Sequence, residues 1–253
     1  MNESLQTTLR KLRLSGLAQS LEVRLHEATS HSLDHAEFLE LILQDELAVR
    51  DDRRMNRRIT AAAFRDARTL EDFDFAFQPK LDVKMIKDLA SCDFVERKEN
   101  VILVGQPGTG KTHLGLALGL KACERGLTVR FTTVQDLAAS LRAAEADRSV
   151  EQRIGELIEP DLVILDELGF TPLEPAVADA FYRIIASRYE RKSLIVTSNK
   201  SFESWAEVFP DAVIASAVLD RLVHHAHLVP IVGESYRMRG HKTRGKEGAA
   251  AAA

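Results

Sequence analysis

One run of residues combines glycines with a lysine and a threonine at the spacing of a phosphate-binding loop, G-x-x-x-x-G-K-[ST]. It reads Gly105-Gln106-Pro107-Gly108-Thr109-Gly110-Lys111-Thr112. The glycines let the backbone turn its N–H groups toward a phosphate, and a following helix adds the positive end of its dipole. Lys111 would neutralise β- and γ-phosphate oxygens, and Thr112 would bind Mg²⁺. The run, with His113 at its end, predicts a nucleoside triphosphate site.

Two acidic residues follow an apolar run farther along the chain. Asp166 and Glu167 come directly after Leu162–Leu165, which we interpret as a buried strand, and open α/β sheets bind ligands at the carboxyl ends of their strands. Asp166 would hold Mg²⁺, and Glu167 would orient and activate an attacking water. The pair could instead be a solvated strand end with helix-capping value, but the glycine-rich loop upstream favours the catalytic interpretation.

A third polar group ends the apolar run Ile195–Thr197. Asn199 could contact a γ-phosphate or the attacking water from the tip of this strand. The alternative is that Ser198 or Asn199 caps a helix beginning near Phe202.

From Asn100 onward the sequence alternates between strand-like and helix-like segments. The expected strands are Val101–Val104, Leu127–Thr133, Leu162–Leu165, Leu194–Thr197 and Leu228–Val232. The expected helices are His113–Arg125, stretches up to about Ile158, Ala176–Tyr189, and short helices at about Phe202–Phe209 and Val213–Val223. Such alternation predicts a parallel sheet covered by helices on both faces.

The chain before Asn100 has a different pattern. Leucines from Leu5 to Leu25 and a second run from Phe38 to Val49 recur near the helical spacing, which predicts a helical domain over 1–68. Ser32 or Asp34 could cap the second helix. Residues 69–99 are expected to form a connector or short extended segment and a helix from Asp82 to about Ala90. Residues 100–235 form the main domain, and 236–253 a basic tail.

Composition narrows the class of protein. The 253 residues are 45% hydrophobic and 28% charged, as in soluble globular proteins. The sequence has neither an apolar stretch long enough to cross a membrane nor a signal peptide. The two cysteines, Cys92 and Cys123, fit a reducing compartment. We therefore expect a cytoplasmic protein without a membrane partner.

The net charge of −4 is unevenly distributed, with −8 over residues 69–220 and +4 over residues 221–253. Two basic groups stand out. The first is Arg50, Arg53, Arg54, Arg57, Arg58, Arg65 and Arg68; the second is Arg237, Arg239, His241, Lys242, Arg244 and Lys246. Each could be a solvated face or could lie along a phosphate backbone. The scarcity of aromatic residues within them argues against base stacking on single strands, whereas charge contacts to the phosphates of a duplex would be independent of sequence and weakened by salt.

Three histidines, His224, His225 and His227, lie near an expected helix end. Their spacing matches no standard zinc pattern, and a partly charged imidazole is favourable at a helix carboxyl end. We predict no metal site from them.

Taken together, the loop, the Asp-Glu pair, the Thr197-Ser198-Asn199 strand end and Leu219-Asp220-Arg221 resemble the AAA+ ATPases. In particular the chain is similar to the IstB-type transposition helper ATPases, which are relatives of the DnaC-type helicase loaders. The resemblance covers nearly the whole chain, including Asp93-Phe94-Val95 and Gly233-Glu234-Ser235-Tyr236-Arg237.

The resemblance implies an α/β AAA+ domain with a small all-α N-terminal domain. It places ATP between protomers of a homo-oligomer, where Arg221 resembles the arginine finger and Arg237 a second arginine sensor. Two features depart from the pattern: Gln106 stands where proline is common, and the chain ends before the helical lid, so no arginine sensor borne on a lid is expected.

The function expected from the residues and the resemblance is that of an ATP-dependent helper of transposition. It would oligomerise on double-stranded DNA with little sequence preference, recruit and stimulate a transposase, and hydrolyse ATP to reset. The alternatives are a helicase loader and a DNA-binding module that uses ATP only structurally. A small-molecule kinase is disfavoured, because a carboxylate beside the magnesium ligand suits water activation.

Overall fold

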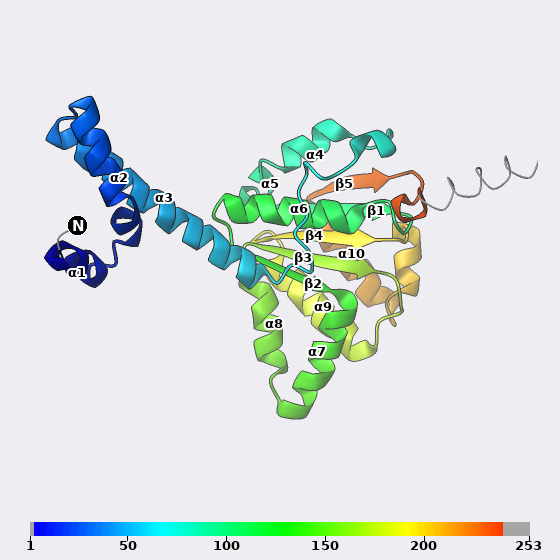
Figure 1. The fold of residues 1–253 in the computed structure, drawn as a ribbon. Coiled ribbons are helices and arrows are strands. Elements are labelled where there is room, and N and C mark those ends of the chain that lie inside the picture. The colour runs from blue at the N-terminus through cyan, green and yellow to red at the C-terminus, as the bar shows by residue number, and fades with distance from the viewer. Residues whose placement is uncertain (1–2, 240–253) are drawn as a thin grey trace, which may run out of the picture. The chain divides into compact units, whose positions relative to one another are not determined.

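The computed structural model describes residues 3–239, which fall into two compact units that divide between Arg57 and Arg58 (Figure 1). The first unit contains α1 (Glu3–Lys11), α2 (Ser15–His31) and most of α3 (His35–Ala62). The leucines that predict helix are divided between α1 and α2, because Arg13 adopts a left-handed conformation with φ of 56°. Among the described residues, no helix is both long and apolar enough to span a bilayer.

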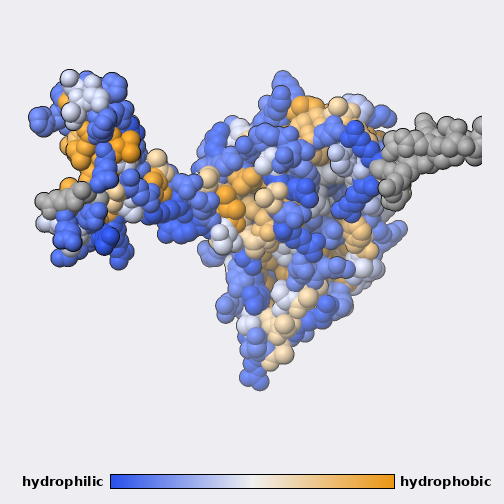
Figure 2. Space-filling view, viewed as in Figure 1, coloured by the Kyte–Doolittle hydropathy of each residue, from blue (hydrophilic) through white to orange (hydrophobic). Residues whose placement is uncertain are grey.

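The first unit has a small apolar core of Leu9, Leu21 and Ile42. Asp34 rather than Ser32 caps α3: its Oδ1 accepts from the N–H groups of Ala36 and Glu37, each at 2.8 Å. Ser32 instead ends α2 in a left-handed conformation. Several large apolar side chains of this unit are exposed, among them Val23, Leu25, Leu39, Leu43 and Leu47. Figure 2 shows orange, hydrophobic surface on this unit.

The second unit begins with the end of α3 and a connector. Of the two expectations for the stretch with alternating phenylalanines, a connector or a short extended segment, the structure has a connector without a strand. The side chain of Asp74 accepts from the N–H of Phe77 at 3.1 Å and so closes a 3₁₀ turn, η1 (Phe75–Phe77). Then follow α4 (Val83–Leu89), which Asp82 caps, and α5 (Asp93–Glu96).

The centre of the second unit is a five-stranded parallel sheet, which confirms the predicted α/β fold. Its strands are β1 (Asn100–Gly105), β2 (Val129–Thr133), β3 (Leu162–Leu168), β4 (Ser193–Ser198) and β5 (Ala226–Ile231), in the order β2-β3-β4-β1-β5. The remaining helices are α6 (Lys111–Glu124), α7 (Val134–Asp147), α8 (Val150–Ile158), α9 (Pro175–Arg188), η2 (Phe202–Glu207), α10 (Ala212–Val223) and η3 (Tyr236–Met238).

Helices cover both faces of this sheet, and the strands show it residue by residue. In β1, Val101 and Leu103 belong to one buried cluster and Ile102 to the other, because successive side chains of a strand point to opposite faces. The cluster that contains Val101 and Leu103 packs against α4, α5 and α6. The cluster that contains Ile102 packs against α7, α8, α9 and α10 (Figure 1). The carboxyl ends of β1, β3 and β4 therefore meet at one edge, where the predicted site residues lie.

The opposite edge of the sheet is held by a buried arginine. Arg188, fully buried at the end of α9, donates five hydrogen bonds to backbone carbonyls. Their acceptors are Leu157, Ile158, Pro160, Asp161 and Ser193. Burial lowers the pKa of Arg188 to about 10, which leaves the guanidinium charged at neutral pH. One side chain thus joins the end of α8 to the beginnings of β3 and β4.

Replacement of this arginine tests its role. We expect Arg188→Met to lower the free energy of unfolding by about 3 kcal/mol or more, because several buried carbonyl groups lose their donor. Urea unfolding measures the change. Arg191→Met, at an exposed position in the next turn, is the matched control and should change stability by less than about 0.5 kcal/mol. Equal effects of the two substitutions would contradict the assignment.

Candidate functional site

The glycine-rich loop joins β1 to α6 in the predicted strand–loop–helix order. Gly108 and Gly110 have φ of 81° and 102°, a conformation that glycine adopts without strain. A β-carbon at Gly105 would collide with the carbonyl oxygen of Ile231 on β5, and one at Gly110 would lie 2.5 Å from the Phe73 ring. Both the backbone turn and the packing around it therefore require glycine here.

Lys111 points back into the turn of the loop. Its Nζ donates to the carbonyl oxygens of Gly105 at 2.7 Å and Gln106 at 2.9 Å. Burial lowers the pKa of Lys111; the carboxylate of Asp166 opposes this shift and the charge of Arg237 adds to it. A half-desolvated ammonium group attracts phosphate oxygens more strongly than one in bulk water.

The structure brings together the two residues predicted to bind Mg²⁺. Asp166 is fully buried, and its Oδ1 accepts from Thr112 Oγ1 at 3.0 Å and from Thr197 Oγ1 at 2.6 Å. Its other oxygen, Oδ2, is buried and has no hydrogen-bond partner within residues 3–239. An unpaired buried carboxylate oxygen beside a threonine hydroxyl is a donor set that suits a hard cation. These residues therefore fit Mg²⁺.

Glu167 follows Asp166 but is oriented by a backbone irregularity. It adopts φ of 65° at a shift in the register between β3 and β4, and its N–H donates to Thr197 Oγ1 at 3.0 Å. Thr197 thus contacts both members of the acid pair. Thr197 belongs to the strand end that carries the resemblance, but only Asn199 was expected to have a role there, so the contacts of Thr197 with the acid pair were missed.

Asn199 follows β4 at the same edge of the sheet. Its Oδ1 is a second buried acceptor that lacks a hydrogen-bond partner within residues 3–239. The alternative expectation, that Ser198 or Asn199 caps the next helix, is wrong: η2 is preceded by Ser201, and no side chain caps it. The Ser198 hydroxyl instead donates to the Leu168 carbonyl oxygen at 2.8 Å and so joins β4 to the end of β3.

Beside the loop lies a cavity of about 460 Å³. Its lining comes from the connector, the loop with the start of α6, and the carboxyl-terminal segment. The predicted nucleotide-binding residues in this lining are Gly108, Thr109, Gly110, Lys111, Thr112, His113 and Arg237; Gly105, Gln106 and Pro107 are not part of it. Phe73, Phe77, Gln78 and Tyr236 also line the cavity and were missed as site residues, although the alternation of the phenylalanines is visible in the sequence.

The carboxyl-terminal segment, residues 234–239, is seated on the loop and the connector. The N–H of Tyr236 donates to the Gly108 carbonyl oxygen at 2.9 Å, and the Tyr236 ring meets the Phe77 ring edge-on at 5.1 Å. Arg239 donates to Asp74 Oδ2 at 2.8 Å. On the other side of the cavity, His113 Nε2 lies 2.7 Å from the Thr69 carbonyl oxygen. These contacts position the connector and the carboxyl-terminal segment around the cavity.

Arg221 makes its contacts on α10 and α9. Its Nη1 donates to the Ala217 carbonyl oxygen at 2.9 Å, and its guanidinium lies over the Tyr182 ring, 5.4 Å from the ring centre. Arg237 belongs to the cavity lining, whereas the predicted catalytic and metal-binding residues absent from it are Arg221, Asp166, Glu167 and Asn199.

The family model of IstB-like ATP-binding proteins matches residues 7–244. The chain belongs to this family. It is 42% identical to an IS21 insertion-sequence protein of Pseudomonas aeruginosa that is named as ATP-binding, over 95% of this chain and 91% of that protein. An IS5376 protein of Geobacillus stearothermophilus with a corresponding name is 36% identical over 94% and 95% of the two chains.

Two solved structures, of DnaI and DnaA, share the fold of this chain. A DnaI crystal structure superposes with a TM-score of 0.57 at 21% sequence identity. The superposed residues make up 65% of this chain and 90% of the DnaI chain. AMPPCP-bound DnaA from Aquifex aeolicus superposes with a TM-score of 0.55 at 23% identity over 71% of this chain. The IstB-like chain spans about half, 55%, of that DnaA chain.

A substitution at Gly108 tests the seating of residues 234–239 on the loop. Gly108→Ala would strain the left-handed backbone and drive its β-carbon into Ser235. We expect ATP binding, measured by calorimetry, to weaken at least about tenfold. The double variant Gly108→Ala/Ser235→Gly removes the collision but not the strain and should recover part of the affinity.

Gly155→Ala, on α8 where a β-carbon meets nothing within 4 Å, is the control and should bind ATP as the unaltered chain does. If the double variant recovers no affinity for ATP, the collision with Ser235 is not a cause of the weaker binding, and the seating of residues 234–239 does not affect the nucleotide site.

Proposed function

We propose that this IstB-like chain hydrolyses ATP with Mg²⁺ as an ATP-dependent helper of transposition. The observation that carries the proposal is the shared contact of Thr112 and Asp166, which leaves a buried carboxylate oxygen unpaired beside the phosphate-binding loop. Glu167 lies next to it at the carboxyl end of β3. A metal ligand and a potential base at adjacent positions favour hydrolysis over structural use of ATP.

In this proposal each side chain has a separate role. Lys111 neutralises phosphate oxygens, and Thr112 and Asp166 hold Mg²⁺, which supplies charge neutralisation on the phosphates when bound. Glu167 orients the attacking water and accepts its proton. Asn199, with an unpaired oxygen at the end of β4, is a second candidate to orient that water. Thr197 keeps the two acidic residues in place through its contacts with both.

The two arginines act from different chains in this proposal. Arg237 lines the cavity of its own chain and is suited to contact the phosphates directly. Arg221 lies outside that cavity, with a backbone carbonyl and a tyrosine ring as its contacts. A planar, permanently charged guanidinium matches phosphate oxygens, so we assign Arg221 to the nucleotide of a neighbouring copy. The active form is then a homo-oligomer.

Double-stranded DNA is the proposed partner of the arginines of α3. Arg50, Arg53, Arg54 and Arg57 are exposed and recur at the three- and four-residue spacing that places side chains along one helix face. Of the second basic group, Arg239 pairs with Asp74 and Arg237 lines the cavity, while His241, Lys242, Arg244 and Lys246 lie outside the described residues. Arg50 and Arg54 also pair, with Glu46 and Asp51 of the same helix, so the choice of α3 for phosphate contacts rests on the spacing and exposure of its arginines.

A transposase is the proposed protein partner. The relatives at 42% and 36% identity carry names of insertion sequences, whereas the likeness to DnaI lies in the fold. This difference favours a transposase over a replicative helicase.

The first test concerns Glu167. We expect Glu167→Gln to slow ATP hydrolysis by about 100-fold or more, because an amide cannot accept the proton of the attacking water, while ATP affinity is unchanged. Phosphate release and calorimetry measure the two quantities. Glu174→Gln, which changes an exposed glutamate before α9, is the matched control. Hydrolysis at the unaltered rate in Glu167→Gln would rule out its role as base.

The second test concerns DNA. Replacing Arg53, Arg54 and Arg57 by glutamine should weaken binding to duplexes of any sequence. A plot of the logarithm of the association constant against the logarithm of the salt concentration has a negative slope. The variant should make this slope less steep by about 0.9 for each DNA phosphate that it no longer neutralises. Fluorescence anisotropy at several salt concentrations measures both. The matched control replaces Arg142, Arg148 and Arg153, from α7, α8 and the turn between them, which removes the same charge. An equal loss of affinity in the control would contradict the assignment to α3.

A further inference from the structure

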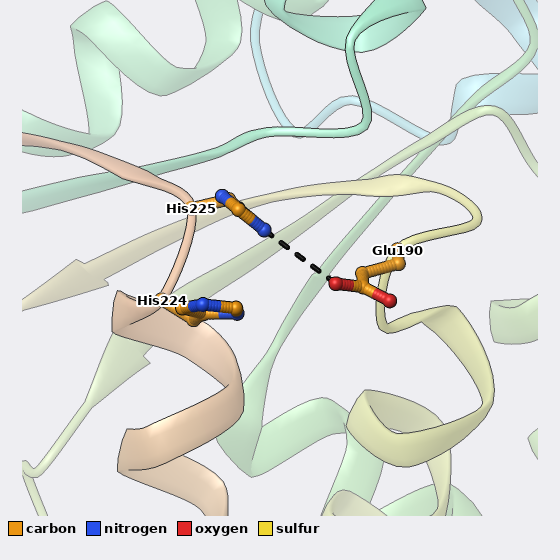
Figure 3. Close-up of side chains that lie close together, drawn as sticks. All are labelled: Glu190, His224 and His225. Atoms are coloured by element: carbon orange, nitrogen blue, oxygen red, sulfur yellow. Dashed lines mark ion pairs between the residues drawn. The ribbon is translucent and has the colours of Figure 1, made fainter.

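Far from the nucleotide site, one glutamate and two consecutive histidines converge at the opposite edge of the sheet. Glu190 follows α9, and His224 and His225 follow α10. One ring nitrogen of each histidine and one carboxylate oxygen of Glu190 all lie within 4.8 Å of one another. Figure 3 shows the two imidazoles and the carboxylate turned toward a common space, with His225 Nε2 3.5 Å from Glu190 Oε1.

This group differs from the histidines that the sequence singles out. His227 is not a member, because its Nε2 lies 2.8 Å from Glu99 Oε2. The third member is Glu190, which lies 34 residues before His224, so no spacing rule along the chain reveals it. The absence of a standard zinc pattern in the sequence therefore does not decide whether these residues form a metal site.

The backbone that carries the group is held rigidly. Asn100, buried at the start of β1, donates its N–H to the His225 carbonyl oxygen at 2.7 Å and its Nδ2 to the Leu222 carbonyl oxygen at 3.1 Å. Its Oδ1 accepts from the N–H of Leu194 at 3.0 Å. The backbone N–H of Asn100 thus holds the turn after α10, and its side chain joins the end of α10 to the start of β4, the strand that follows Glu190.

Two local features orient the side chains themselves. The Tyr189 hydroxyl lies 2.6 Å from His224 Nδ1, which leaves Nε2 of that ring as the nitrogen for a further ligand; metal-binding histidines usually have such a partner on the other nitrogen. Glu190 has a φ of 56° directly after α9, where glycine is the residue that fits without strain. A glutamate here keeps a carboxylate beside the histidines at a cost in backbone strain.

We propose that Glu190, His224 and His225 bind one divalent transition-metal ion, with Zn²⁺ as the best match. Two imidazoles and one carboxylate are ligands that zinc uses, and three protein ligands leave a coordination position for water or another group. Mg²⁺ is a poor match, because it prefers oxygen ligands. The bound ion would join the turn after α9 to the end of α10, one helical turn beyond Arg221, and would so restrain the helix that carries this arginine.

The experiment uses the full chain without a polyhistidine tag and without nucleotide. The chain is titrated with ZnCl₂ in the presence of excess MgCl₂. The Mg²⁺ occupies oxygen sites such as that at Asp166, so that zinc does not bind there. We expect one Zn²⁺ per chain by calorimetry and a higher midpoint of thermal unfolding with zinc. We also expect visible ligand-field absorption with Co²⁺ that zinc displaces. Glu190→Gln, His224→Gln and His225→Gln should each weaken zinc binding at least about tenfold.

Two further variants separate metal binding from folding. Glu190→Gly relieves the backbone strain, so it should be at least as stable as the unaltered chain without zinc and yet lose the zinc-dependent stabilisation. His227→Gln changes a histidine of β5 outside the proposed site and should bind zinc with the affinity of the unaltered chain. The proposal is overturned if no saturable binding is found, or if zinc binding is unchanged in the Glu190 and His224 variants. Loss of binding in His227→Gln to the same extent would also overturn it.

Discussion

The site of this protein depends on the burial of one carboxylate. Asp166 is fully enclosed at the end of β3, and a single one of its oxygens accepts both of its hydrogen bonds. A buried charge with an unpaired oxygen is unfavourable unless a cation or another donor completes it. The fold holds the carboxylate there because hydroxyl groups from α6 and β4, Thr112 and Thr197, converge on it. This local imbalance is the feature that makes the site suited to the hard cation proposed above.

The same arrangement connects the parts of the site to one another. Thr112 lies in the first turn of α6, directly after the glycine-rich loop, and the hydroxyl of Thr197 also accepts from the N–H of Glu167. The loop, the acid pair and the end of β4 are therefore joined through two threonine hydroxyls. A parallel sheet makes such a junction possible, because β1, β3 and β4 all end at one edge. The opposite edge is held by two other buried polar side chains, Asn100 and Arg188, each of which makes hydrogen bonds to several elements.

Much of the fold and part of the site could be predicted because their signals are local. The loop is a contiguous pattern, and the buried strands are short apolar runs between helical segments. The misses arise from contacts between distant residues or from competing local hydrogen bonds. The Asp74 side chain folds the phenylalanine run into a turn, and the left-handed Arg13 divides the first leucine-rich run. Thr197 and Glu190 acquire their partners only through the tertiary fold, and a single sequence contains no spacing rule for such pairs.

The seating of the carboxyl-terminal segment makes one wall of the cavity depend on a few surface contacts. Tyr236 is hydrogen-bonded to Gly108 and packs against Phe77, while Arg239 bridges to Asp74. Tyr236 and Arg237 line the cavity, so the shape of this wall depends on those contacts as well as on the loop itself. An exposed ion pair such as Arg239–Asp74 is weakened by salt, so high ionic strength would loosen one of the attachments of this wall.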